Sequence, residues 1–182
     1  MMGHTHMLIG FATGLAISHG APLEQAIAQG VVCAVAAIVP DIDHPQADIR
    51  RRMGVFSHLL DWLPHRGITH TVAALSVWVI LCSLFGGALA LAAIAGFASH
   101  LVADMMTRSG LPLLLPLSDR RWYLLPKVMR IRTASVFEQM IAGCMALLII
   151  QMTGIAPTAQ LMLSYVDGLF REISKWLPLA LG

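Results

Sequence analysis

Apolar residues occur along this chain in long runs, and short polar stretches rich in proline, glycine or charge separate these runs. Uniformly apolar runs predict helices that are apolar on every face, which is typical of helices buried in a membrane. The predicted helices cover residues 6–18, 23–39, 71–85, 88–103, 137–155 and, with less apolar character, 158–181.

Proline and glycine mark the ends of these helices. Pro22 is suited to the start of a helix, Pro40 ends the same helix, and Gly86-Gly87 divides one long apolar stretch in two. The first four helices are therefore expected to form two helical hairpins. A polar loop over residues 41–69 separates the hairpins, and a second loop over residues 105–135 follows them.

Composition makes a water-soluble fold implausible. The chain of 182 residues is 57% hydrophobic and 12% charged, with a mean hydropathy of +0.74, whereas about a quarter of the residues in soluble domains are charged. We expect an all-α, polytopic membrane helical bundle that forms one domain over residues 1–182. It would have about five transmembrane segments and a C-terminal helix, 158–181, that is either amphipathic at the interface or a sixth span.

Several predicted helices are shorter than the roughly 20 residues that cross a bilayer. They are expected to tilt little, to lie in thinned lipid or to be partly re-entrant. Cys33, Cys82 and Cys144 each lie inside an apolar run without CxxC spacing, so we interpret them as small buried hydrophobic residues rather than as a disulfide framework or thiolate site.

The placement of charge predicts an orientation. A net charge of +2 gives no reason to expect a nucleic-acid partner. The two polar loops carry ten lysines and arginines while the hairpin turns carry none, which predicts that the loops face the cytoplasm. In the second loop, Trp122 and Tyr123 stand beside Arg120 and Arg121, either as an interfacial anchor or as a stacking surface for a headgroup.

Histidine and aspartate gather at the helix ends that this topology places at the cytoplasmic edge. Ionisable residues in so apolar a chain are costly unless they are paired, solvated or bound to a cation. Imidazole with carboxylate suits zinc first, with manganese or iron as alternatives. His100 and Asp104 share a helix face above Gly96, whose small size would allow another helix to approach. The candidate metal ligands are His6, Asp41, Asp43, His65, His70, His100 and Asp104.

Other readings of these residues remain open. The aspartates could pair with loop arginines instead of a metal, and isolated histidines such as His19 and His58 could simply be solvated. Arg66 and Arg108 could either clamp a phosphate or serve as topological charges. Glu138 could act as a base, although a cap at the start of the fifth helix is the better-supported role.

Several short motifs together resemble a known family. The set comprises an early TH, PDIDH, HRGITH, SHLVADMMTRSG and LLLPL, and it covers about residues 4–125. It is similar to the bacterial membrane-bound metal-dependent hydrolases, a family of the inner membrane with some LexA-regulated members. The resemblance implies that the seven candidate ligands hold one or two metal ions, and that Thr107 and Gly110 shape the adjacent turn.

We therefore expect a membrane-embedded hydrolase that uses a metal-activated water on a phosphoester of a lipid or lipid-linked substrate. Asp43 or Asp104 would act as general base, and Arg66 or Arg108 would stabilise charge in the transition state. The alternative is a metal-stabilised membrane scaffold or a divalent-cation carrier without catalysis. A carrier predicts polar residues through the bilayer, which the apolar middle of the helices lacks.

Overall fold

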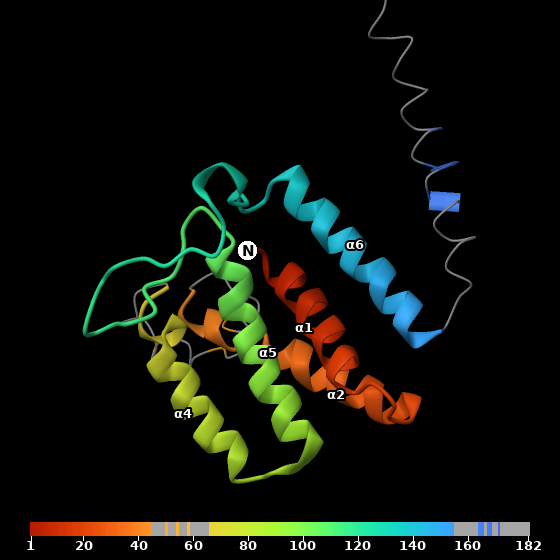
Figure 1. Cartoon of the computed structure of the whole chain (residues 1–182), viewed down its shortest axis with the longest axis horizontal. Helices are drawn as coiled ribbons and strands as arrows, with labels where there is room; N and C mark the ends of the chain where they lie inside the picture. The colour runs from red at the N-terminus through yellow and green to blue at the C-terminus, as the bar shows by residue number, and fades with distance from the viewer. Residues whose placement is uncertain are drawn as a thin grey trace, which may run out of the picture.

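The computed structural model describes residues 1–44, 50, 54, 58, 66–154, 164–165, 167–168 and 171. Every regular element in these residues is helical, which confirms the predicted all-α class. The helices are α1 (Gly3–Ile17), α2 (Leu23–Ala36), α4 (Val72–Ser83), α5 (Gly87–Met105) and α6 (Val136–Thr153), shown in Figure 1. Short 3₁₀ turns lie at η1 (Pro40–Asp43), η3 (Ile68–His70) and η4 (Lys127–Met129).

Local chemistry explains where the helices begin and end. The side chain of Thr71 accepts a hydrogen bond from the backbone of Ala74 at the start of α4, and Ser135 does the same for Glu138 at the start of α6. Gly154 ends α6 in a left-handed conformation with φ of 64°. These are the polar-to-apolar transitions at which the hydrophobic pattern predicts helix ends.

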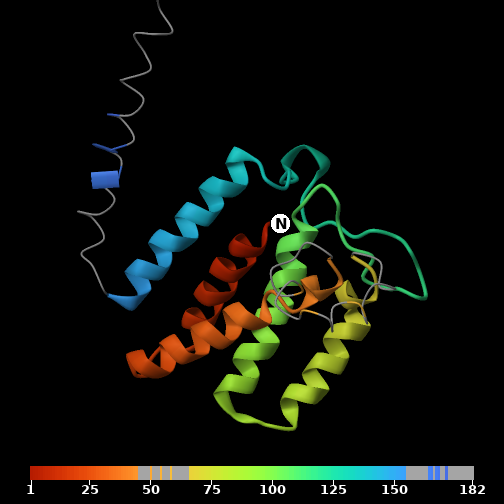
Figure 2. The same cartoon turned by 180° about the vertical axis from the view of Figure 1, so that it is seen from behind.

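The helices form two hairpins and one additional helix. α1 packs against α2 in the first hairpin, and α4 packs against α5 in the second. α5 also lies against both α1 and α2, while α6 packs on α1 (Figures 1 and 2). The predicted pairing of the first four helices is therefore confirmed, and α5 is the element that joins the hairpins.

Two glycines permit this close packing. A Cβ atom on Gly96 of α5 would lie 2.2 Å from the carbonyl oxygen of Cys33 in α2. A Cβ atom on Gly14 of α1 would lie 2.6 Å from the Cα atom of Gly30 in α2. Small residues let helix backbones approach one another in membranes, where van der Waals contact drives helix association. The expectation that Gly96 admits a neighbouring helix is confirmed.

The number of spans is smaller than the five expected. In the described part of the chain, Leu23–Asp43, Gly87–Met105 and Val136–Thr153 are long and apolar enough to cross a membrane. α1 has 15 residues and α4 has 12, which is less than the roughly 20 residues that cross the hydrocarbon core. α4 is confined between its Thr71 cap and the Gly86-Gly87 turn. The sixth predicted segment, 158–181, lies mostly outside the described residues.

The cysteine prediction holds at two positions and is wrong at the third. Cys33 and Cys82 are buried, whereas Cys144 is exposed. Cys144 lies on α6, which packs mainly against α1 and therefore leaves much of its surface uncovered. An apolar run indicates an apolar surrounding, but in a membrane that surrounding can be lipid as well as protein.

Glu138 fastens the start of α6 to the rest of the bundle. Its buried carboxylate accepts hydrogen bonds from the backbone N–H groups of Met2 and Ala134, both at 2.6 Å. A negative charge in the first helical turn is also favourable to the helix dipole. The structure thus supports the capping role for Glu138, with an added tie to the beginning of α1.

Replacement of Gly96 by alanine is expected to destabilise the bundle, because the added methyl group would collide with the α2 backbone. We expect the free energy of unfolding in detergent to fall by ~1–3 kcal/mol, measured by circular dichroism. Gly143→Ala in α6 is the matched control, since its added Cβ meets nothing within 4 Å. Equal stability of the two variants would contradict the close contact at Gly96.

Candidate metal centre

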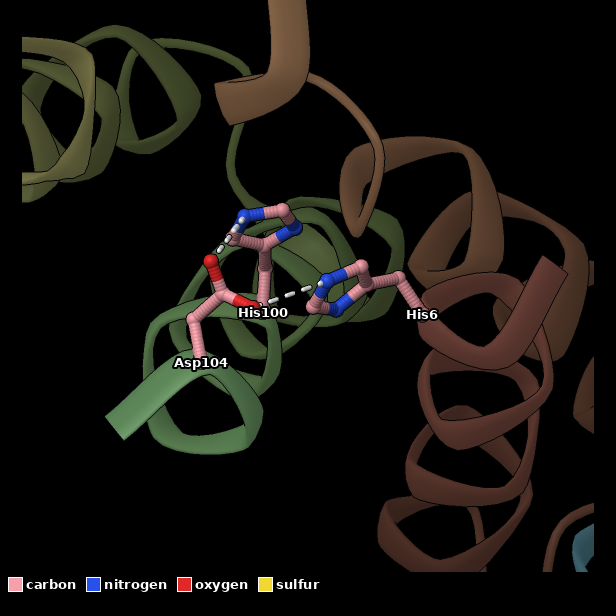
Figure 3. Close-up of side chains that lie close together, drawn as sticks. All are labelled: His6, His100 and Asp104. Atoms are coloured by element: carbon pink, nitrogen blue, oxygen red, sulfur yellow. Dashed lines mark ion pairs between the residues drawn. The ribbon is translucent and has the colours of Figure 1, made fainter. Parts of the chain in front are cut away.

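Polar side chains from four separate segments meet at one end of the bundle. His6 comes from α1, Asp41 from η1, His70 from η3, and His100 and Asp104 from the last turns of α5. The side chains of His70 and His100 have no exposed surface, and the side chain of Asp41 is 15% exposed. The close-up in Figure 3 shows the Asp104 carboxylate beside the rings of His6 and His100, with one ion pair drawn to each ring.

Backbone and hydroxyl partners set the orientation of two imidazoles. Nδ1 of His100 lies 2.7 Å from the carbonyl oxygen of Ala37, so this nitrogen carries the proton. Nδ1 of His70 lies 2.9 Å from the Thr69 hydroxyl, which itself donates to Oδ2 of Asp43 at 2.5 Å. Nδ1 of His70 therefore donates as well. In both rings Nε2 is left with its lone pair directed into the cluster.

The two lone pairs face each other at close range. Nε2 of His70 and Nε2 of His100 are 3.1 Å apart. Oδ1 of Asp41 lies 3.7 Å from each of these nitrogens, and Oδ2 of Asp104 lies 4.0 Å and 3.9 Å from them. The two nitrogens and the nearby carboxylate oxygens are all electron-rich, so a cation between them would be stabilised.

These distances fit tetrahedral coordination. Ligand atoms 2.0–2.2 Å from a zinc ion are about 3.3–3.6 Å from one another in a tetrahedron. The two histidine nitrogens lie 3.1–4.0 Å from each other and from the carboxylate oxygens, which brackets that range. A divalent cation could be held by the group of Asp41, His70 and His100 or by the group of His6, His100 and Asp104. His100 belongs to both groups. Because its Nδ1 is bonded to Ala37, its Nε2 is the one nitrogen that can bind a cation, so the two groups describe one centre rather than two.

His6 lies at the border of this centre, and the nitrogens of its ring lack hydrogen bonds. Its ring stacks on that of His100 with centroids 3.8 Å apart. Both ring nitrogens of His6 are buried without a hydrogen-bond partner among the described residues. Nε2 of His6 nevertheless lies 3.3 Å from Oδ1 of Asp104. The same oxygen contacts the α-amino group of Met1.

Asp43 lies behind His70 rather than among the four facing atoms. Its Oδ2 is 3.2 Å from Nδ1 of His70 and accepts the Thr69 hydroxyl and the backbone N–H of Arg66. A carboxylate that holds the outer nitrogen of a ligating histidine fixes the ring and raises its basicity. The structure therefore favours a positioning role for Asp43. Thr69, which is not among the predicted site residues, completes this arrangement.

Arg66 brings a fixed positive charge to the edge of the centre. One guanidinium nitrogen lies 3.0 Å from Oδ2 of Asp104, and another donates to the hydroxyl of Thr107 at 3.3 Å. The backbone of Arg66 is left-handed, with φ of 56°, which is uncommon for a residue other than glycine. This conformation directs the N–H of Arg66 to Asp43, and its side chain to Asp104.

The electrostatic environment favours positive charge on His70. Burial lowers the pKa of His70, but the adjacent carboxylates of Asp41 and Asp43 outweigh this effect and raise the pKa above its ordinary value. A proton and a metal cation compete for the same lone pair. The side chains present therefore fit a divalent cation both in spacing and in charge.

Not every predicted site residue joins the cluster. His65 lies outside the described residues. Arg108 is exposed, and its backbone N–H bonds to the carbonyl of Ile131, so its side chain is not part of the centre. Thr107 is buried and donates its hydroxyl to the backbone of Asp104, and Gly110 has φ of 60°, both consistent with a shaped turn after α5.

Fold and site together define a helical membrane protein with a buried histidine–aspartate cluster at one end of its bundle. A family model described as YdjM inner membrane protein matches residues 1–171, and the chain belongs to this family. Its membership confirms the expected membrane-bound family and the inner-membrane location.

Two relatives illustrate the extent of the similarity. The uncharacterized protein YvsG of Bacillus subtilis (strain 168) is 31% identical over 152 residues, which cover 81% of this chain and 91% of YvsG. The inner membrane protein YdjM of Escherichia coli (strain K12) is 31% identical over 168 residues, which cover 82% of this chain and 80% of YdjM. No solved structure matches the chain.

Replacement of Asp43 by asparagine is expected to weaken zinc binding, because the neutral amide holds the outer nitrogen of His70 less strongly. Loss of such an outer partner typically lowers metal affinity about 10–100-fold, which competition with a chromophoric chelator would measure. Asp119→Asn, at an exposed position, is the matched control. Unchanged affinity in Asp43→Asn would show that Asp43 does not position His70.

Proposed function

We propose that this protein is a membrane-embedded, metal-dependent hydrolase that cleaves a phosphoester of a lipid or lipid-linked substrate. The observation that supports it best is that Nε2 of His70 and Nε2 of His100 lie 3.1 Å apart, with carboxylate oxygens of Asp41 and Asp104 3.7–4.0 Å from them. These separations suit ligands of a zinc ion. Manganese and iron are the alternative metals for such a donor set. A cation bound there would lower the pKa of water and polarise a phosphoryl oxygen.

His6 is the residue that we assign to proton transfer. Its ring nitrogens are buried and lack hydrogen-bond partners among the described residues, and Asp104 lies close enough to stabilise the protonated ring. An imidazole nitrogen that has no hydrogen-bond partner and lies beside a carboxylate is suited to accept a proton from water. The sequence offers Asp43 or Asp104 as the base. Asp43 accepts hydrogen bonds from Thr69 and Arg66, and Asp104 pairs with the Arg66 guanidinium, so we assign the role to His6.

Arg66 is placed to bind the phosphate group of the substrate. Its guanidinium contacts the carboxylate of Asp104 and the hydroxyl of Thr107. A phosphate group next to Asp104 would therefore lie within reach of Arg66. The planar fork of arginine matches two phosphate oxygens at once. Charge that develops on the phosphoryl oxygens during cleavage would be stabilised by this side chain.

The location of the buried charges supports an active site at the membrane edge over a carrier. Among the described residues, the buried ionisable side chains are His6, Asp43, Arg50, His70, His100, Asp104 and Glu138. These side chains belong to the helix ends and junctions around the centre, rather than to the middle of the apolar helices. A through-path for cations would need polar groups deeper in the bilayer.

Two histidine substitutions separate metal binding from proton transfer. His70→Ala is expected to lose both bound zinc and lipid turnover. His6→Ala is expected to keep its zinc and to lose turnover about 10²–10⁴-fold. Metal content is measured by mass spectrometry of the purified protein, and turnover by product analysis with a bacterial lipid extract.

His4→Ala is the matched control, because His4 is exposed on the same helix, two residues before His6. It should retain both zinc and activity. Loss of zinc from His6→Ala would make His6 a ligand instead of a proton acceptor. Full activity of His70→Ala would end the catalytic assignment.

Conservative replacement of Arg66 tests the phosphate contact. Lysine keeps the charge but loses the bidentate fork, so Arg66→Lys is expected to reduce kcat/KM for a phosphoester by ~10²-fold. Arg108→Lys, in which the exposed arginine changes in the same way, should leave kcat/KM unaltered. The measurement is steady-state kinetics in mixed micelles, and equal effects of the two substitutions would exclude Arg66 as the phosphate-binding residue.

A further inference from the structure

An apolar groove adjoins the candidate metal centre. It has a volume of about 240 Å³ and lies between η1 and η3 on one side and the helices α4 and α5 on the other. Ala74, Val77 and Leu81 of α4 line it, together with Trp78 and Phe97. Ala74 and Leu81 are seven residues apart, so the groove follows α4 for about 10 Å.

The groove and the centre share their polar end. Thr69 lines the groove and also hydrogen-bonds to Asp43 and contacts His70. Pro40 and Ile42 line the groove on either side of Asp41 in the chain. An occupant of the groove would therefore have one end next to the facing donor atoms and the other end along α4.

The floor of the groove is rigid. The indole N–H of Trp78 donates to the carbonyl of Ala93 at 2.9 Å, and its ring stacks on Phe97 with centroids 5.5 Å apart. Val77 and Leu81 remain 57% and 49% exposed at the rim. The groove is therefore already formed beside α5, and it is open on the side of Val77 and Leu81.

The chemistry of the lining defines the occupant. None of the described lining residues is charged, and Thr69 is the one that carries a hydroxyl. The portion of a ligand along α4 must therefore be hydrocarbon, because a polar group there would lose its hydrogen bonds. At the other end, the guanidinium of Arg66 beside Asp104 and the candidate cation site call for an anionic head.

We propose that this groove holds one hydrocarbon chain of a membrane lipid with a phosphate head, and so places that head at the histidine–aspartate centre. The proposal rests on the proposed function and specifies its substrate as a lipid that is recognised by chain and head together. Lipid hydrocarbon around the protein is as apolar as the groove, so the groove contributes orientation rather than affinity.

Trp78 gives a direct readout, because it lies in the groove. The test uses the full chain with Trp62, Trp122 and Trp176 replaced by phenylalanine, reconstituted in phosphatidylcholine nanodiscs. A small fraction of the lipid carries bromine on its chains, either as phosphatidic acid or as phosphatidylcholine. Random collisions quench Trp78 equally with both lipids, so extra quenching by brominated phosphatidic acid reports occupation of the groove.

A matched pair of substitutions links this signal to the groove. Val77→Phe fills the rim and is expected to abolish the extra quenching. Ile80→Phe, at a position on α4 that is 63% exposed and does not line the groove, is expected to retain it. Leu81→Phe repeats the test at the far end of the groove, away from the donor atoms. Zinc content and helical circular dichroism verify that each variant is folded.

The outcomes separate this proposal from the proposed function. Equal quenching by both lipids, or extra quenching that survives Val77→Phe, overturns the groove proposal. A dimer that protects Trp78 would likewise overturn it, because a second copy would be the occupant. Extra quenching without any lipid turnover would retain the groove and end the hydrolase assignment. Lipid turnover that Val77→Phe leaves unchanged, together with no extra quenching, would retain the hydrolase assignment and end the groove proposal.

Discussion

Close contact between α5 and α2 is the constraint on which the centre depends. The backbone of α5 approaches Cys33 so closely at Gly96 that no side chain fits between them. His100 is one helical turn further along α5, and the same contact brings its ring to the carbonyl of Ala37 at the end of α2. A helix kept further away by a larger residue would leave the His100 ring without this partner and without its fixed tautomer.

Fixed tautomers turn a group of polar side chains into a site with directed lone pairs. Ala37 holds His100 through a backbone carbonyl, whereas Thr69 and Asp43 hold His70 through side chains. The inner nitrogens of both rings consequently face the same space, although repulsion between them is unfavourable. A divalent cation bound between the two nitrogens would remove this repulsion.

The sequence predicts the hairpins and the end of the bundle at which polar residues meet, because proline, glycine and apolar runs are local signals. It does not predict which atom of each residue faces the centre. Asp43 belongs to the same motif as Asp41, yet the two carboxylates lie on different sides of the His70 ring. The difference arises partly from the left-handed backbone of Arg66, which no hydrophobic pattern encodes. Exposure of Cys144 was missed for a related reason, since lipid and protein are equally apolar surroundings.

The length of the second hairpin has a consequence for the surrounding bilayer. From Gly87 to His100 the helix rises about 20 Å, which is about 10 Å less than a typical hydrocarbon core. If the Gly86-Gly87 turn lies at one interface, the histidines lie below the level of the opposite interface. Around α1 and α4, which have 15 and 12 residues, the leaflet on that side is expected to thin, as membranes do near short helices. Headgroups and water would descend to the histidines, and a lipid could reach them without leaving its leaflet.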